Sequence, residues 1–223
     1  GVPGLQAAEN LHVLRQAVIG QLLDIFKAAG ILCSMGLGVA VLFLVFWWDE
    51  SCDHPFTEYA PTEIIQSCVL AASIVLFWGQ VRLRPGMRKA LILVCGLLGC
   101  MLIREQDYFL DMVTHGFWKW PAFALAAACI AYALATPAAT IASMAKLSRD
   151  RCIFSLFTGL VIVLAYSRIL GTGILWKTLL PGENWRIAKY AVEESSELLG
   201  YLIILFSAFL LRGSKALPHD DGK

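Results

Sequence analysis

The stretch Ala90-Leu-Ile-Leu-Val-Cys-Gly-Leu-Leu-Gly-Cys-Met-Leu-Ile-Arg104-Glu-Gln-Asp-Tyr-Phe-Leu-Asp111 decides how this chain folds. Its first part, residues 90–103, is an uncharged apolar run of 14 residues. As a helix this run rises about 21 Å, whereas the hydrocarbon core of a bilayer is about 30 Å thick. A membrane-spanning helix must therefore carry the charged side chains that follow, Arg104, Glu105 and Asp107, into or close to the apolar layer. Charged groups at that depth are costly, usually face the interior of a helix bundle and are candidates for a functional site.

Composition places the chain among polytopic membrane proteins. Of its 223 residues 58% are hydrophobic, and several long apolar runs follow one another. The net charge of +1 gives no support to a nucleic-acid-binding surface. We therefore predict an all-α fold with an N-terminal amphipathic, interfacial helix within residues 1–30, a single transmembrane bundle over 31–211 and a polar C-terminal tail over 212–223.

Six transmembrane helices are predicted within this bundle. They lie at 31–48, 64–81, 90–103, 121–145, 152–176 and 198–211. The third is expected to continue through Asp111 and the sixth to begin as early as Glu193. The fifth is interrupted at Arg168. Residues 5–27 have apolar positions at helical spacing with charges between them, which favours a helix lying on the membrane surface.

The basic turns predict the orientation in the membrane. The turns at 82–89 and 146–151 and the start of the tail at Arg212 fall on one side of a six-span arrangement. By the positive-inside rule this side is cytoplasmic. We therefore expect a bacterial inner-membrane protein with both termini in the cytoplasm and the lipid bilayer as its surroundings.

Spans three, five and six each run short of uncharged residues at the non-cytoplasmic end. This shared depth predicts one buried polar site near the periplasmic face, made of Arg104, Glu105, Asp107, Asp111, Arg168, Glu193, Glu194 and Glu197, with Glu63 at the same level. Glu193 and Glu197 are four residues apart and share a helical face. Asp107, Asp111 and His115 also recur at intervals of four, so a continued helix would align three potential metal ligands.

Charge balance predicts a ligand for this site. Seven acids against two arginines cannot all stay ionised in a site of low dielectric constant, so either some carboxylates are protonated or a cation binds among them. Carboxylates with a histidine suit a divalent metal such as zinc, iron or manganese. The predicted metal ligands are Asp107, Asp111, His115, Glu193 and Glu197. The planar guanidinium groups of Arg104 and Arg168 suit the headgroup of a lipid or a polyprenyl phosphate.

Three short motifs resemble the motif order of the alkaline ceramidase/adiponectin-receptor superfamily. They are Glu63-Ile-Ile-Gln-Ser67, Asp107 at the end of span three, and a pair spaced by four residues at the start of the last span. The resemblance implies a zinc-dependent lipid amidase with Asp107 as a site residue and Ser67 as an oxyanion or water partner. The last pair is Glu193-x-x-x-Glu197 where that family has two histidines. Arg104-Glu-x-Asp and Glu193-Glu-x-x-Glu-Leu-x-Gly are also similar to strings in uncharacterised bacterial inner-membrane proteins.

Three functions are compatible with these patterns. The first is a metal-dependent hydrolase or transferase acting on a lipid-like substrate, in which the metal activates water. Its catalytic residues would be Glu105, Asp107 and Glu194, and its substrate-binding residues Arg104, Arg168 and Ser67. The second is a small ion- or proton-coupled transporter. The third is a non-catalytic assembly subunit with a structural ion-pair network and a membrane-protein partner.

Overall fold

The computed structural model describes residues 61–180 and 185–214, together with isolated helical positions between 15 and 44. The chain divides into two units, Gly1–Phe43 and Leu44–Lys223, and every helix named below belongs to the second. Within the described residues the regular structure is helical throughout. Apart from the isolated positions, the predicted interfacial helix at 5–27 and the predicted span at 31–48 lie outside the described residues.

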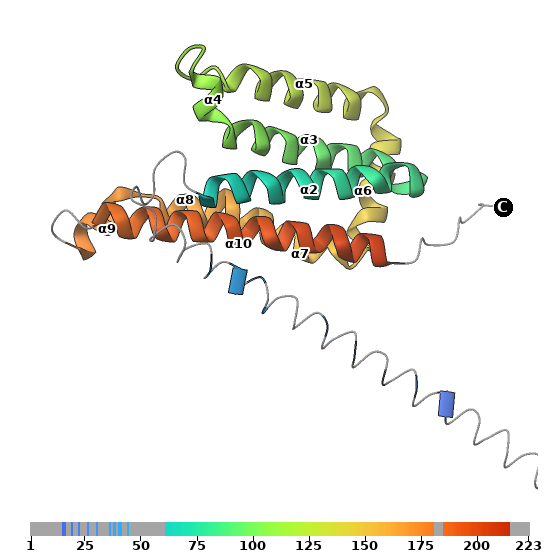
Figure 1. The fold of residues 1–223 in the computed structure, drawn as a ribbon. Helices are drawn as coiled ribbons and strands as arrows, with labels where there is room; N and C mark the ends of the chain where they lie inside the picture. The colour runs from blue at the N-terminus through green and yellow to red at the C-terminus, as the bar shows by residue number, and fades with distance from the viewer. Residues whose placement is uncertain are drawn as a thin grey trace, which may run out of the picture. The chain divides into compact units, whose positions relative to one another are not determined.

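Five helices pack as neighbours in the order α5, α3, α2, α10 and α7 (Figure 1). Their bounds are α2 Pro61–Leu83, α3 Arg88–Glu105, α5 Lys119–Ala135, α7 Cys152–Val161 and α10 Trp185–Gly213. The longest of the five, α10, packs on α2 and on α7 although it follows both in the chain. Large apolar side chains buried between these helices form the core: Leu70, Phe77, Leu91, Leu98, Leu156, Tyr201, Ile204 and Leu211.

The α2–α3 turn follows from Pro85. A residue before proline is disfavoured in the helical region, and Arg84 accordingly has φ −126° and ψ 73°. The single 3₁₀ turn η1, Pro85–Met87, then leads directly into α3. The turn thus reverses the chain in a few residues and makes α2 and α3 antiparallel neighbours.

A pair of glycines lets α7 and α10 approach closely. A Cβ atom added to Gly159 would lie 2.6 Å from Cγ1 of Ile204 and 2.7 Å from the backbone oxygen of Gly200. Only residues without a side chain fit at such a crossing, as is usual where helices pack in membranes.

Four helical segments are long and apolar enough to cross a membrane. They are Thr62–Leu83, Pro85–Glu105, Cys152–Leu170 and Trp185–Gly213, all among the residues that the structure describes. The segment Pro85–Glu105 is separated by Gln106 from the short helix α4, Asp107–Asp111, so the predicted prolongation through Asp111 is not one continuous helix. The last segment begins at Trp185, before the predicted start at Glu193. Long apolar helices of this kind indicate a membrane protein.

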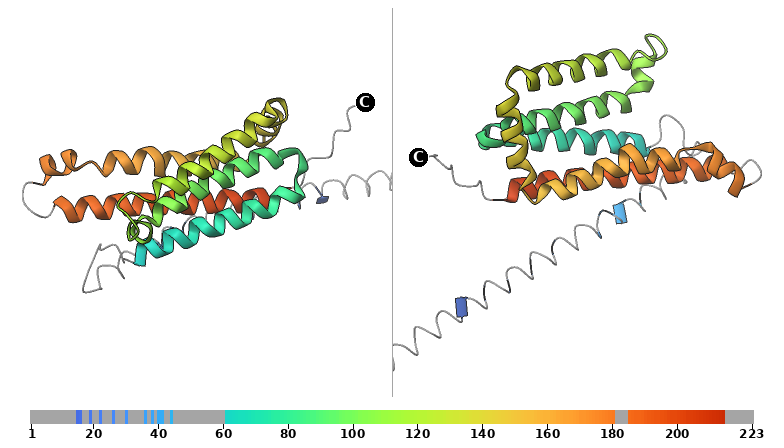
Figure 2. Two further views of the ribbon diagram at one scale, coloured as in Figure 1. Left: turned by 90° about the horizontal axis from the view of Figure 1, so that it is seen from above. Right: turned by 180° about the vertical axis from the view of Figure 1, so that it is seen from behind.

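The prediction of one continuous helix over 121–145 is wrong. The structure has α5 and then α6, Pro137–Ser148, with a bend of 103° between them. The cause is Pro137, which cannot continue the hydrogen-bond ladder and forces Thr136 out of the helical region, to φ −146°. Figure 2 shows α6 running across the bundle, and it packs against α3 and η1. The pair counts as a fifth span only if both halves are taken together.

The predicted fifth span also differs in detail from the structure. Arg168 does not interrupt the helix: α7 continues through a π-helix, Ile162–Tyr166, into α8, Ser167–Leu170. The helix ends instead at Gly171, and α9, Gly173–Leu179, follows.

The two basic turns and the end of α10 share one end of the bundle, which we call the turn end. The buried Arg84 side chain forms an ion pair with Asp150 at 3.5 Å and donates hydrogen bonds to the backbone oxygens of Leu211 and Ser214. The hydroxyl of Ser214 donates to Asp150 at 2.9 Å. Arg84 therefore satisfies carbonyl groups at the C-terminus of α10, where a cation is favourable.

Candidate functional site: a carboxylate–arginine cluster

The opposite end of the bundle holds a buried carboxylate between two arginines. Glu197 of α10, with only 4% of its side chain exposed, lies 3.3 Å from Nη2 of Arg104 at the end of α3. Its other carboxylate oxygen pairs with Arg168 of α8. We call Arg104, Glu105, Arg168, Glu193 and Glu197 the carboxylate–arginine cluster. A single carboxylate thus joins three segments, α3, α8 and α10, that are far apart in the sequence.

Glu105 adds a second carboxylate on the inner side of the cluster. Its side chain is nearly buried, pairs with Arg104, and accepts a hydrogen bond from the hydroxyl of Tyr201 at 2.6 Å. Tyr201 is itself fully buried, one turn after Glu197 on α10. The phenol therefore meets the requirement that a buried tyrosine hydroxyl find a partner.

The π-helix brings Ser167 into the cluster. Its backbone N–H donates to the carbonyl of Ile162, five residues back, so it does not make the usual bond to Val163. The hydroxyl of Ser167 donates to the Val163 carbonyl instead, at 2.7 Å, and lies 3.3 Å from the Glu197 carboxylate. The wider turn thereby sets Ser167 and Arg168 beside the same carboxylate.

Glu193 forms the outer part of the cluster. Its carboxylate lies 3.5 Å from Arg168 and 3.3 Å from Lys189, one turn earlier on α10. A Cβ atom added to Gly171 would lie 2.6 Å from the Cδ atom of Glu193, so the glycine makes room for this carboxylate. Arg168 is 43% exposed here, so this part of the cluster is more open than the Glu197 site.

Glu194 lies next to the cluster with a different kind of partner. The side-chain amide of the fully buried Gln66, on α2, donates to the Glu194 carboxylate at 2.9 Å and to its backbone oxygen at 3.1 Å. Within the described part of the chain, no lysine or arginine lies within 4.0 Å of this carboxylate. The other amide atom, Oε1 of Gln66, is a buried acceptor that has no hydrogen-bond partner among the residues that the structure describes.

The remaining predicted residues of this region are Ser67, Asp107 and Glu63. Ser67 accepts a hydrogen bond from Gln106 at 2.7 Å, which ties α2 to the end of α3. Asp107 is exposed at the first position of α4. Glu63 is half-buried in the first turn of α2.

The predicted alignment of Asp107, Asp111 and His115 on one helix is wrong. Helix α4 ends at Asp111, and Gly116, with φ +80°, turns the chain. Asp111 accepts a hydrogen bond from the backbone N–H of Gly116 at 2.9 Å and lies 3.3 Å from the ring of His115, which is fully exposed. Among the described residues no three His, Cys, Asp or Glu side chains gather as metal ligands. The predicted metal and lipid-like substrate remain predictions.

Charge balance in the cluster differs from the count made on the sequence. Four carboxylates, including Glu194, meet three cations, because Lys189 joins Arg104 and Arg168. The arginines thus neutralise carboxylates of the same chain. Such an arrangement can hold helices together, and Glu194, bound by an amide, can exchange a proton without breaking an ion pair.

Sequence reasoning missed three members of this region: Gln66, Ser167 and Lys189. A signal existed for Gln66, since it is one of two amides inside the apolar run 64–81. None existed for Ser167, because its place depends on the π-helix. No protein-family model, curated protein or solved structure matches this chain, so its function has to be inferred from the geometry of the cluster itself.

Proposed function

We propose that this chain is a non-catalytic assembly subunit of the bacterial inner membrane. In this proposal it has six spans and an N-terminal interfacial helix, with both termini in the cytoplasm and the cluster near the periplasmic face. The ion-pair network holds α3, α8 and α10 in one arrangement. The bundle then presents α5 to a membrane-protein partner.

The observation that carries the proposal is the pairing of Glu197 with both Arg104 and Arg168. Buried charges in membranes are costly unless they pair, and pairing between helices fixes their relative placement. The sequence-based argument for a metal was an excess of negative charge. In the structure, Arg104, Arg168 and Lys189 meet four carboxylates, so the need for a cation is smaller, and the arginines are already engaged by carboxylates.

The exposed surface of α5 supports the proposal that a membrane-protein partner packs there. None of its 17 residues is buried, although it packs on α3. Small exposed side chains recur along it, at Ala124, Ala127, Ala128, Ala131 and Ala135. In membranes such residues allow another helix to approach closely.

Photo-crosslinking in native membranes tests this proposal. A photoreactive residue at position 128 should give a discrete cross-linked protein product, whereas the same residue at the exposed Phe154 of α7 should not. The change Glu197→Gln should reduce the product at position 128, because it loosens the bundle, and Lys189→Gln should leave it nearly unchanged. Equal amounts of cross-linked product at positions 128 and 154 would contradict the proposal.

Stoichiometric zinc, iron or manganese in protein purified without added metal would instead support the metal-dependent hydrolase.

A second function, proton-coupled transport, is favoured by one specific observation. Glu194 is held by the amide of Gln66, without a cation within 4.0 Å among the described residues, and the amide oxygen of Gln66 is an unsatisfied buried acceptor. Carboxylates in this setting serve as proton carriers in membrane transporters.

Proton flux into vesicles tests this second function. Vesicles reconstituted with the full chain and holding a pH-sensitive dye should acidify after an imposed pH step, and Glu194→Gln should abolish the signal. Asp111→Asn, a change at an exposed turn, is the matched control and should keep it. A flux that Glu194→Gln does not alter would rule out this role for Glu194.

A further inference from the structure

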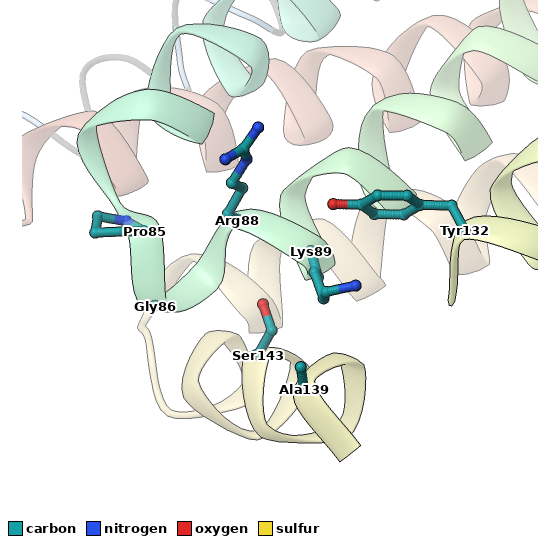
Figure 3. A pocket seen from close by; sticks show the side chains of 7 residues that line it. All are labelled: Pro85, Gly86, Arg88, Lys89, Tyr132, Ala139 and Ser143. Atoms are coloured by element: carbon teal, nitrogen blue, oxygen red, sulfur yellow. The ribbon is translucent and has the colours of Figure 1, made fainter. Parts of the chain in front are cut away.

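The turn end of the bundle contains a cavity of about 350 Å³ that the proposed function does not use. Residues from η1, α3, α5 and α6 line it: Pro85, Gly86, Arg88, Lys89, Tyr132, Ala139 and Ser143 (Figure 3). The cavity exists because α5 and α6 meet at the 103° bend, which leaves space between Tyr132 on one helix and Ser143 on the other. Its volume is at the small end of the range for ligand sites, about 300–1,000 Å³.

The cations at this cavity form no ion pair with a carboxylate of the described residues. The ammonium group of Lys89 lies 4.5 Å from the centre of the Tyr132 ring and donates a hydrogen bond to the hydroxyl of Thr136. The ammonium group of Lys146 lies beside Gly86 of the cavity lining, since a Cβ atom added to Gly86 would lie 3.2 Å from its Nζ atom. Within the described ranges 61–180 and 185–214, no ion pair links a carboxylate to Arg88, Lys89 or Lys146.

The nearby acid is already engaged. Asp150 is the single carboxylate in the two basic turns, against seven lysines and arginines. It pairs with Arg84 and accepts hydrogen bonds from Ser214 and from the backbone N–H of Cys152. The positive charge at the cavity therefore remains available to an anion from outside.

The cavity also offers neutral hydrogen-bond donors. Ser143 accepts the backbone N–H of Ala90 at 3.0 Å, which leaves its own hydroxyl hydrogen able to donate. Figure 3 shows Lys89 between Tyr132 and Ser143, with the guanidinium of Arg88 projecting away from Ser143. Several donors with a high positive charge are the features that recognise a phosphate group.

We propose that this cavity binds a phosphate group, carried either by an anionic phospholipid or by a small molecule in solution. Basic pockets between membrane helices on the cytoplasmic side hold anionic lipid headgroups. The lipid source depends on the proposed placement in a membrane, whereas the binding of free phosphate does not. Neither depends on the carboxylate–arginine cluster, which lies at the other end of the bundle.

Binding measurements on the full chain in a non-ionic detergent separate the two sources. The probes are short-chain phosphatidylglycerol, short-chain phosphatidylcholine and inorganic phosphate, each titrated while the affinity is measured. Preferential binding of phosphatidylglycerol over both other probes supports a lipid headgroup, and binding of inorganic phosphate supports a soluble phosphate ligand. Failure of both phosphatidylglycerol and phosphate to bind overturns the proposal.

Matched variants show whether the binding takes place in the cavity. The double change Lys89→Gln and Lys146→Gln should weaken binding by about a hundredfold, at about tenfold for each charge-assisted contact. Arg149→Gln and Arg151→Gln remove the same charge from exposed positions of the same turn and should change the affinity less than threefold, as roughly expected for screened surface charges. Equal losses in both double variants overturn the proposal, because they indicate unspecific attraction.

Tyr132→Phe, which removes one hydroxyl and keeps the packing, should weaken binding severalfold and covers the case in which the lysine variant does not fold.

Discussion

At the scale of single residues, the cluster depends on one carboxylate that serves two cations. Glu197 is almost inaccessible, whereas Arg104 is 31% exposed and Arg168 is 43% exposed. The two guanidinium groups therefore reach the surface of the bundle in part, whereas the carboxylate does not. Arg104 keeps Glu105 as a second partner and Arg168 keeps Glu193, so a loss at Glu197 leaves each arginine with one carboxylate.

The variant Glu197→Gln should lower the free energy of unfolding markedly. Removing one member of a buried ion pair costs about 3–5 kcal/mol, and the partial exposure of the arginines places the expected loss at the lower end of that range. Unfolding of the purified protein by denaturant in detergent micelles measures this loss in the free energy of unfolding. Lys189→Gln is the control, since it removes an outer partner of Glu193 and should cost less than about 1 kcal/mol. If both variants unfold at the same denaturant concentration, Glu197 is not the centre of the network.

At the scale of helices, two local departures from regular geometry place the functional groups. The π-helix Ile162–Tyr166 sets Ser167 and Arg168 against Glu197. The break at Pro137 creates the turn-end cavity. The π-helix could not be read from spacing, because it has no clear composition of its own. The break carried a signal, Pro137, but the length of the apolar run around it suggested a continuous span.

The glycine crossing of α7 and α10 provides a test at this scale. Gly200→Leu should separate the two helices, because its Cβ atom would meet Val163 and the backbone oxygen of Gly159. Overpacking of this kind costs about 1–3 kcal/mol, or more where the contact is with backbone. The same unfolding titration measures the loss. Gly79→Leu is the control, since no atom lies within 4 Å of the added Cβ position there, and its stability should stay closer to that of the parent protein.

For the molecule as a whole, the sequence predicted the depth of the charged groups better than their direction. Short apolar runs indicated that Arg104, Arg168 and Glu197 share one level, and the structure brings them into contact. Run length does not tell which way a side chain points around its helix. That is why the partners Gln66 and Lys189 were missed and Asp107 was placed in the site although it is exposed.

Accessibility labelling tests the proposed orientation of the molecule. In a cysteine-free background, cysteine introduced at Thr114, beside the exposed His115, should react with a membrane-impermeant maleimide added to intact spheroplasts. Cysteine introduced at Arg149, at the turn end, should react only after the membrane is opened. The reverse pattern would invert the topology, and labelling of both positions from outside would contradict a membrane-spanning bundle.

The central place of α10 has a consequence for the biosynthesis of the protein. This helix packs between α2 and α7, yet it is translated after both of them. Until it arrives, Gln66 and Arg168 have no access to the carboxylates that they hold in the finished protein, and Arg104 has only Glu105. The nascent chain must therefore stay at the insertion machinery until α10 is made, while Gln66 and Arg168 lack their carboxylate partners. A chain truncated before residue 185 lacks α10, and we expect cellular proteases to degrade it.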